Sequence, residues 1–350
     1  MHLSPEFGYT ISEIENSGYK IDKKIECLLS SDTAVGVTKS VGLALIGLAD
    51  ALEELKPDFI VILGDRSEML AAASASMFAN IPIAHIHGGE TTEGAYDESI
   101  RHAISKMSYY HFASTEVYRQ RIIQLGEDPK RVFNVGAIGL DSIKSLNLLS
   151  KSEFEKSIDF KLGKKNILVT FHPVTLEDNS AEKQFNTILD ALKALKDTNI
   201  IFTHANSDKN GRIINQMIES FVKEQSENSI SFKSLGQLRY LSALQYVDCV
   251  LGNSSSGIVE VPYFNITTIN IGDRQKGRVM PESVLNIQPL KKEIESAIEK
   301  SFDSSFIHKI KNQKQLYGNG NSVQTIIKVI SSLKSQNLKK PFYDIPYNGN

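Results

Sequence analysis

Short apolar runs rich in β-branched residues alternate with longer segments of helical periodicity along most of this chain. Because apolar residues fill these runs without alternating with polar ones, we expect parallel strands buried on both faces. Regular alternation with helices predicts an α/β fold with right-handed crossovers. The expected strands are Phe59–Leu63, Ile83–Ile86, Val132–Val135, Ile167–Phe171, Ile200–Thr203, Cys249–Leu251 and Thr267–Ile271.

The length of 350 residues is enough for two domains, each with its own core. A polar segment, residues 149–165, separates two series of strands and helices and is the expected boundary. We therefore predict a first domain over residues 1–150, a second over residues 163–335, and a loosely ordered tail over residues 336–350.

Composition excludes several classes of protein. The chain has 39 Lys and Arg against 41 Asp and Glu, so its formal charge is −2 and no basic surplus indicates a nucleic-acid partner. Cys27 and Cys249 are the only cysteines, which excludes a disulfide framework. We find no secretory signal and no apolar stretch near the roughly 20 residues that span a bilayer. We expect a cytoplasmic protein with no membrane partner.

Polar residues follow six of the expected strands, in both halves of the chain. In open parallel sheets, ligands bind outside the carboxyl ends of the strands. These residues therefore predict a ligand site in a cleft between two facing domains. They are Gly64–Arg66, His87–Glu90, His172 with Pro173, His204–Asn206, Gly252–Gly257 and Gly272–Arg274.

The segment GNSSSG, residues 252–257, enters a predicted helix in the second half. Such a turn offers backbone N–H groups to a diphosphate, or it is an ordinary serine N-cap. Glu260 can accept hydrogen bonds from ribose hydroxyls, or it complements the helix dipole. Arg274 can bind a phosphate, or it is a solvated loop residue. Because the GxGxxG and GxxxxGK[ST] signatures are absent, the diphosphate would belong to neither a nicotinamide nor an ATP site.

Ionisable residues gather in the first half, and each also has a structural explanation. Asp97 and Arg101 can form an i,i+4 ion pair on a helix, and Asp65 can cap the next helix. Three carboxylates and an imidazole near neighbouring strand ends nevertheless predict paired acid and base chemistry. Without an HExxH pair, we expect no metal site. The candidates are Asp65, His87, Glu90, Asp97 and Arg101.

Several motifs together resemble the hydrolysing UDP-N-acetylglucosamine 2-epimerases of sialic and legionaminic acid biosynthesis, over the chain from Met1 to about Phe342. They are GDRSEMLAAA, HIHGGETTEGAYDESIRHAI, VTFHPVT, SLGQLRYLSAL, GNSSSGIVEVP and INIGDRQKGR. The resemblance implies the GT-B architecture, with two Rossmann-like domains around the active site. It implies no metal or redox cofactor, and a homo-oligomer, a dimer or tetramer. The implied reaction converts UDP-N-acetylglucosamine and water to UDP and N-acetylmannosamine, through elimination of UDP and hydration of a glycal.

The resemblance also implies roles at matching positions. The catalytic candidates Asp65 and Asp97 match carboxylates of the family's chemistry, and Arg101 matches the arginine that follows the second of them. The implied nucleotide-binding residues are His2, His172, Ser254, Ser255 and Gly257, with Glu260 at the ribose and Arg274 on the phosphate side.

The sequence departs from the family at two places. Many relatives have glutamate where this chain has His87, so proton transfer falls to Glu90 or to His87 as a neutral base. Relatives also begin with a strand, a TGTRAEYG-type turn and a helix that precede MHLSPEFG. We therefore expect Met1 to be an internal methionine and the first strand–helix unit to be missing.

Two alternatives remain beside the leading function. The same reaction on UDP-N,N′-diacetylbacillosamine would change only the sugar. A truncated, inactive protein that binds UDP-sugars without turnover would explain the missing unit. A non-hydrolysing epimerase is disfavoured, because HIHGGE and DESIRHA differ from that branch's HVEAGLR and EEANR.

Overall fold

The computed structural model describes residues 2–4, 9–29, 33–91, 96–173, 181–205, 211–332 and 338–346. The chain divides into two compact units. Unit 1 comprises residues 1–90, 96–134 and 326–350, and unit 2 comprises residues 91–95 and 135–325. These ranges differ from the expected domains, 1–150 and 163–335, at both ends of unit 2.

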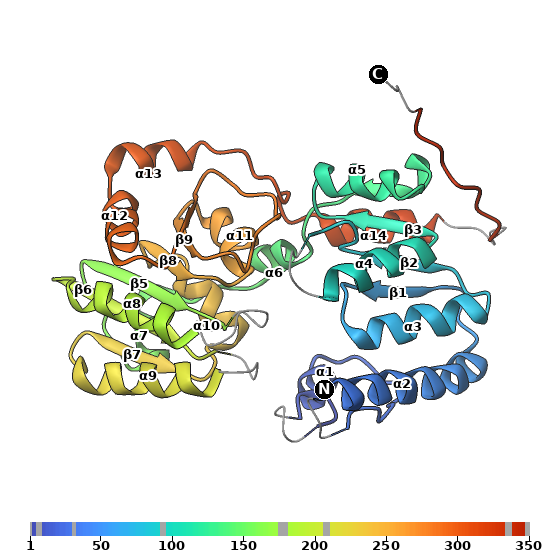
Figure 1. Ribbon diagram of the computed structural model, residues 1–350, viewed down its shortest axis with the longest axis horizontal. Coiled ribbons are helices and arrows are strands. Elements are labelled where there is room, and N and C mark those ends of the chain that lie inside the picture. Colours follow the sequence, from blue (N-terminus) through green and yellow to red (C-terminus); the bar gives the residue numbers. More distant parts are fainter. Residues whose placement is uncertain are drawn as a thin grey trace. The chain divides into compact units, whose positions relative to one another are not determined.

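Unit 1 contains a four-stranded parallel sheet in the order β1-β2-β3-β4 (Figure 1). The strands are Ile60–Leu63, Ile83–Ile86, Tyr110–Ala113 and Val132–Asn134. Its helices are α1 (Ile11–Asn16), α2 (Ala34–Leu55), α3 (Ser67–Phe78), α4 (Tyr96–Met107) and α5 (Glu116–Gln124), with a 3₁₀ turn, η2, at Pro129–Arg131. Each helix from α3 to α5 follows one strand and leads to the next, which is the right-handed crossover pattern expected from the sequence.

Unit 2 contains six parallel strands in the order β10-β9-β8-β5-β6-β7. They are β5 (Lys165–Thr170), β6 (Thr198–Thr203), β7 (Ser229–Phe232), β8 (Cys249–Gly252), β9 (Thr267–Ile271) and β10 (Val284–Ile287). The helices are α6 (Gly139–Ser145), α7 (Lys151–Ile158), α8 (Ala181–Lys193), α9 (Gly211–Glu224), α10 (Gly236–Ala243), α11 (Ser256–Val259), η3 (Val261–Phe264), α12 (Lys291–Ser301) and α13 (Ser304–Lys311). Helix α14 (Ser322–Ser331) leads the chain back to unit 1.

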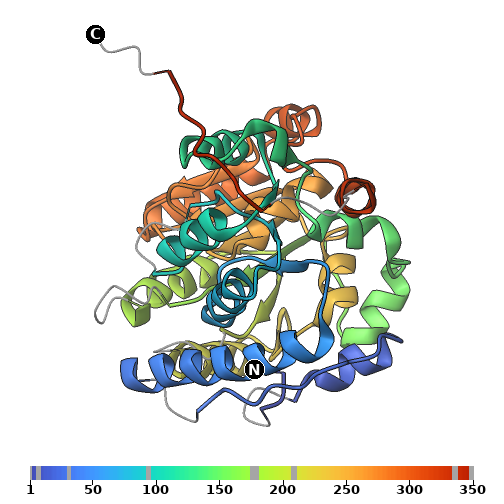
Figure 2. The same ribbon diagram turned by 90° about the vertical axis from the view of Figure 1, so that its right-hand side faces the viewer.

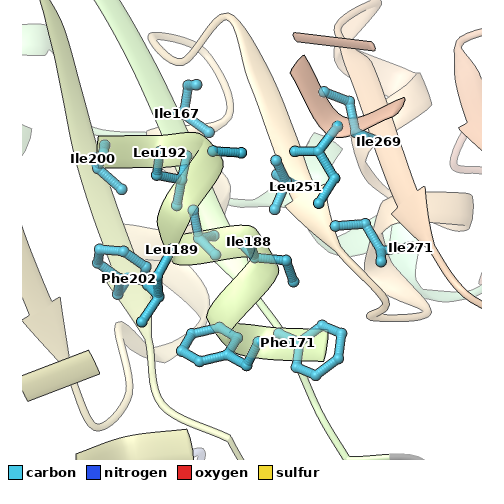
Figure 3. Close-up of a cluster of buried hydrophobic side chains, with 14 of the residues drawn as sticks. Ile167, Phe171, Ile188, Leu189, Leu192, Ile200, Phe202, Leu251, Ile269 and Ile271 are labelled. Atoms are coloured by element: carbon cyan, nitrogen blue, oxygen red, sulfur yellow. The ribbon is translucent and has the colours of Figure 1, made fainter. Parts of the chain in front are cut away.

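Helix α8 illustrates how the periodic apolar pattern builds the core of unit 2. Phe185, Ile188, Leu189 and Leu192 recur at helical spacing and are buried. Figure 3 shows the last three of them against side chains from the strands. Full burial of each such side chain is worth about 1.5–3 kcal/mol. The stripe therefore accounts for both the helix and its orientation on the sheet.

The expected α/β class and the seven expected strands are confirmed, with ends that differ from the expected ones by at most two residues. Three strands escaped the sequence analysis: β3, β7 and β10. Their sequences are YHFA, SISF and VLNI, short runs in which polar residues interrupt the apolar pattern. Pairing with neighbouring strands, and not local composition, makes them strands.

The polar segment 149–165 is a structured part of unit 2. Ser150 and Glu153 form a capping box at the start of α7, and the Phe154 ring stacks on Tyr246 at 6.1 Å. Charged residues on the exposed side of this helix gave the segment the composition of a linker. The unit boundary lies before it, near residue 134.

Residues 338–346, expected to be part of a loosely ordered tail, pack on unit 1. The Lys340 ammonium bonds to the buried Glu127 carboxylate at 2.9 Å and to the carbonyl oxygen of Lys106 at 2.7 Å. The amide of Tyr343 donates to the carbonyl of Gly126 at 2.9 Å. Residues 333–337 and 347–350 lie outside the described part of the chain.

Helix α2 contradicts the expectation that no segment is long and apolar enough to span a bilayer. Its 22 residues pass that test by length and composition, which is weak evidence for a membrane because core helices pass it as well. Small residues such as Gly, Ala and Ser hid the segment from a search for bulky apolar runs. In unit 1, α2 packs against α3, and both views show these two blue helices side by side (Figures 1 and 2).

Candidate functional site

In unit 1, an arginine joins the ends of two strands. Asp65 follows β1 after Gly64, whose φ of +75° makes the turn. Arg101, in the second turn of α4, pairs with the Asp65 carboxylate and donates to the carbonyl oxygen of Glu90 at 2.8 Å. Arg101 is buried, so its charge is held in place by these oxygens. The structure thus brings together Asp65, Glu90 and Arg101.

His87 and Glu90 meet directly after β2. His87 Nδ1 lies 3.2 Å from Glu90 Oε1, and the hydroxyl of Ser114 donates to the same oxygen at 2.7 Å. Ser114 follows the last residue of β3, so the contact depends on a strand that the sequence analysis missed. Glu90 is buried, whereas His87 is partly exposed.

A second imidazole lies beneath this group. His85 is fully buried in β2, with Nε2 2.9 Å from the carbonyl oxygen of Gly64 and Nδ1 3.1 Å from the hydroxyl of Ser105. Burial lowers the pKa of His85 to about 3, so the ring is neutral. A Cβ at Gly88 would lie 2.9 Å from His85 Nδ1, so glycine is required for the loop to pass over the ring.

Asp97 and His2 complete the predicted residues of unit 1. Asp97 lies in the first turn of α4, one turn before Arg101, and is half-buried. His2 is exposed, and its Nδ1 is 2.8 Å from the hydroxyl of Thr10. Among the described residues, no hydrogen bond or ion pair joins His2 to these carboxylates, and its assignment stays a prediction.

In unit 2, the strand order reverses between β5 and β8, because the chain builds the sheet outward in one direction and then in the other. Ligands of open α/β sheets bind at such a switch point. His172 follows β5, and the GNSSSG segment begins at the end of β8. The topology therefore places both predicted segments at the expected position in this sheet.

Asn253 ties the loops at this switch point together. Its side chain accepts from the amide of His172 at 2.8 Å and donates to the carbonyl of the same residue at 2.7 Å. Its own carbonyl accepts hydrogen bonds from Arg274 and Gln275, each at 2.9 Å. One buried residue thus holds the loops after β5, β8 and β9.

Two glycines permit close packing in the same segment. Gly252 has a φ of +145°, and a Cβ there would lie 1.8 Å from the carbonyl oxygen of Thr170. A Cβ at Gly257 would lie 2.7 Å from the Thr268 methyl group, and Thr268 donates to the Gly257 carbonyl at 2.6 Å. These contacts require glycine at both positions for packing alone.

The serines of GNSSSG do not form a strong helix cap. Ser255 is the N-cap of α11 but makes no capping hydrogen bond with its side chain. The Ser254 hydroxyl accepts from the amide of Ser256 at 3.4 Å, a long bond. The N-cap interpretation therefore explains little of this segment, which keeps the phosphate interpretation open.

Glu260 lies in a largely buried environment in unit 2. Burial raises its pKa, opposed by a hydrogen bond to Ser256. The Ser256 hydroxyl is 2.5 Å from the hydroxyl of Tyr240, whose pKa burial also raises. Gly139 faces the carboxylate, since a Cβ there would be 3.4 Å from Glu260 Oε1. A buried carboxylate held at one side in this way can accept a hydroxyl donor at the other.

The residues that sequence reasoning missed are Ser114, His85, Asn253 and Tyr240. His85, Asn253 and Tyr240 lie inside motifs quoted above, so their buried positions and contacts were the missing information. Ser114 lies outside these motifs and is recognised only through the pairing of β3 with β2. Among the described residues, no cluster of three His, Cys, Asp or Glu side chains is arranged to hold a metal ion.

Residues 1–331 match the sequence model of the family described as UDP-N-acetylglucosamine 2-epimerase. The chain belongs to this family. The resemblance inferred from the motifs is thus confirmed, and the enzyme is a hydrolysing UDP-sugar 2-epimerase, like the relatives below.

Two curated relatives are similar over most of their length. The chain is 46% identical over 305 residues to the GDP/UDP-N,N′-diacetylbacillosamine 2-epimerase (hydrolyzing) of Campylobacter jejuni, covering 87% of this chain and 79% of that relative. It is 38% identical over 352 residues to the polysialic acid biosynthesis protein P7 of Escherichia coli, covering 99% of this chain and 88% of that relative. At these identities and coverages, both relatives belong to the same family as this chain.

A solved structure supports the fold. The UDP-GlcNAc 2-epimerase of Neisseria meningitidis bound to UDP-GlcNAc superposes with a TM-score of 0.80 at 19% identity, covering 93% of this chain and 89% of that one. At this identity the likeness shows the fold alone, which is the expected GT-B-like α/β fold with two parallel sheets.

Proposed function

We propose that this enzyme converts UDP-N,N′-diacetylbacillosamine and water to UDP and the 2-epimeric free sugar. The observation that carries the choice of substrate is the 46% identity to a relative named for that sugar, over 87% of the chain. A Legionella pneumophila relative with the same sugar in its name is 35% identical over 97% of the chain. The leading expectation from the motifs, UDP-N-acetylglucosamine, becomes the second substrate to test.

The chemistry accounts for the residue types in unit 1. No carbonyl acidifies the C2 proton, so departure of UDP must first develop positive charge at C1, as in glycoside cleavage. Carboxylates can stabilise that charge and guide the water that follows. The proposed catalytic group is Asp65, His87, Glu90, Asp97 and Arg101.

The proposed roles in unit 2 concern the leaving nucleotide. Asn253 and the two glycines fix the loops at the switch point of the sheet, where a diphosphate can meet hydroxyls and backbone N–H groups. The partly exposed Glu260 carboxylate, hydrogen-bonded to Ser256 on one side, suits a ribose hydroxyl pair. The proposed nucleotide-binding residues are His2, His172, Ser254, Ser255, Gly257, Glu260 and Arg274.

The test is turnover of both UDP-sugars by the purified chain in deuterated water. We expect release of UDP, together with a 2-epimeric sugar carrying deuterium at C2, and a higher kcat/KM for the diacetylated substrate. A higher kcat/KM for UDP-N-acetylglucosamine would reverse the assignment of the sugar. Binding of UDP without release from either substrate would indicate the inactive, sugar-binding alternative. Light scattering of the same preparation tests the proposal of a homo-oligomer. Fractionation of cells that contain the chain tests the proposal of a cytoplasmic location.

A further inference from the structure

Three side chains at the carboxyl ends of β2 and β3 form a chain of contacts. We propose that Ser114 and Glu90 are positioning residues that hold His87 as the base removing the C2 proton. This inference rests on the proposed function and extends it by assigning the base. It also resolves the choice between His87 and Glu90 that the sequence left open.

The side chains of Ser114, Glu90 and His87 differ in how deeply they are buried. Glu90 Oε1 accepts the Ser114 hydroxyl at 2.7 Å and lies 3.2 Å from His87 Nδ1. The side chain of Glu90 is 8% exposed and that of His87 is 22% exposed. The order from the interior outward is therefore Ser114, Glu90, His87. The imidazole is the outermost of the three groups, and the carboxylate lies behind it.

The backbone of His87 is held in an unusual conformation that supports this order. Its φ is +66°, in the left-handed region that residues other than glycine seldom adopt. Its amide donates to the carbonyl oxygen of Phe112 in β3 at 2.9 Å. The neighbouring strand thus fixes the main chain of His87, and Ser114 at the end of that strand fixes the carboxylate.

A carboxylate beside Nδ1 influences which ring nitrogen is basic. With Glu90 Oε1 at 3.2 Å, the tautomer with its proton on Nδ1 is favoured, and this tautomer has its lone pair on Nε2. The same arrangement orients the histidine of hydrolytic triads, where the carboxylate also stabilises the imidazolium that forms. Glu90 is less suited to be the base itself, because it is more buried and its Oε1 already contacts two groups.

In the elimination step, Nε2 of His87 takes the C2 proton, and the C2–H electron pair becomes the C1=C2 double bond. The bond from C1 to the β-phosphate oxygen breaks, and its electron pair leaves with UDP. The positive charge on the imidazolium is then neutralised by the Glu90 carboxylate, and the proton returns to solvent before the next turnover.

A purely structural role for Glu90 makes a different prediction about kinetics. If Glu90 only orients the base, neutralising its charge slows proton removal while binding of the UDP-sugar is kept, so kcat falls and KM changes little. Loss of structure lowers kcat and weakens binding together.

The experiment compares four variants with the wild-type chain, measuring kcat and KM for UDP release from both UDP-sugars. His87→Asn keeps a residue type that tolerates positive φ, and we expect kcat to fall by about 100-fold or more. Glu90→Gln should lower kcat with KM nearly unchanged, and Ser114→Ala should do the same to a smaller extent. Ser76→Ala is the matched control, since the Ser76 hydroxyl is buried and has no hydrogen-bond partner among the described residues. UDP binding checks that each variant is folded.

The outcomes separate this inference from the proposed function. Wild-type chain that releases no UDP from either sugar overturns both. Wild-type turnover with a His87→Asn variant that binds UDP and keeps its rate within threefold overturns the assignment of the base alone. A kcat that stays at the wild-type value in both Glu90→Gln and Ser114→Ala, or a KM that rises as much as kcat falls, overturns the positioning roles.

Discussion

The contact between residues 338–346 and unit 1 predicts that Lys340→Met measurably weakens the docking of this segment. Glu127 is completely buried, and Lys340 Nζ contacts both of its oxygens, at 3.0 and 2.9 Å. Burial acts to raise the pKa of Glu127, but hydrogen bonds from His111, Lys106 and Lys340 outweigh it and lower the pKa to about 2. Against 4.5 for an ordinary glutamate, this difference corresponds to about 3 kcal/mol of stability.

Only part of that free energy belongs to Lys340. His111 and Lys106 also contact the carboxylate, at 3.2 and 2.8 Å. Burial lowers the pKa of Lys340 despite the nearby carboxylate, so the cost of burying the ammonium offsets some of the gain. We therefore expect Lys340→Met to weaken docking of the segment by about 2 kcal/mol, below the range for breaking an isolated buried pair.

Hydrogen exchange measures this docking directly. The Tyr343 amide is bonded to the Gly126 carbonyl, so its exchange reports opening of the segment. A loss of about 2 kcal/mol corresponds to exchange faster by about 30-fold at pH 7. Lys130→Met is the control, because Lys130 is exposed and no ion pair of its side chain is seen among the described residues.

The pH dependence has a definite sign. The folded-state pKa of Glu127 is depressed, so its contribution is complete above pH 4.5 and is lost as pH falls toward 2. The difference in the exchange rate of the Tyr343 amide between wild type and Lys340→Met should therefore become smaller over that range. Equal exchange of the Tyr343 amide in both proteins at pH 7, or an unchanged difference at pH 3, would refute the reasoning.

Three further predictions concern the two candidate groups. Asp97→Asn should abolish UDP release while leaving UDP binding largely intact, as followed by chromatography and calorimetry; unchanged turnover would remove Asp97 from the mechanism. Gly252→Ala should destabilise unit 2 by more than about 3 kcal/mol in urea unfolding, because its methyl group collides with the Thr170 carbonyl; an unchanged midpoint would contradict this packing. His85, with a pKa near 3, should show no NMR titration between pH 5 and 9, and its burial makes stability decrease as pH falls below about 6.5; a midpoint within that range would show that the ring is accessible.

Local sequence predicted the parts of the fold that rest on continuous apolar runs. Strands such as β2 and β9 were placed to the residue, because burial on both faces demands apolar side chains. Strand β3, whose sequence is YHFA, was not predicted, and the position of Ser114 beside Glu90 was lost with it. That contact arises from pairing between strands, which no local pattern records.

The same distinction explains the C-terminal segment. Lys340 and Glu127 are separated by 213 residues, and a lysine among polar neighbours resembles any exposed lysine in sequence. The chemical candidates were easier to identify, because glycine, imidazole and carboxylate at strand ends are conspicuous among apolar runs. Their mutual contacts, and hence the order of Ser114, Glu90 and His87, required coordinates.

The edge of the unit 1 sheet affects how readily the enzyme self-associates in solution. Val61 and Leu63 point to the same side of β1 and are 46% and 49% exposed. Among the described strands, β1 is the outermost of this sheet and pairs with β2 alone. A strand edge beside apolar side chains favours self-association. Salts that are excluded from protein surfaces strengthen apolar contacts, whereas ionic strength weakens charge pairs. Association through this surface would therefore increase with sulfate concentration and with protein concentration. Particle size in solution must be compared at several concentrations of sulfate and at several concentrations of protein.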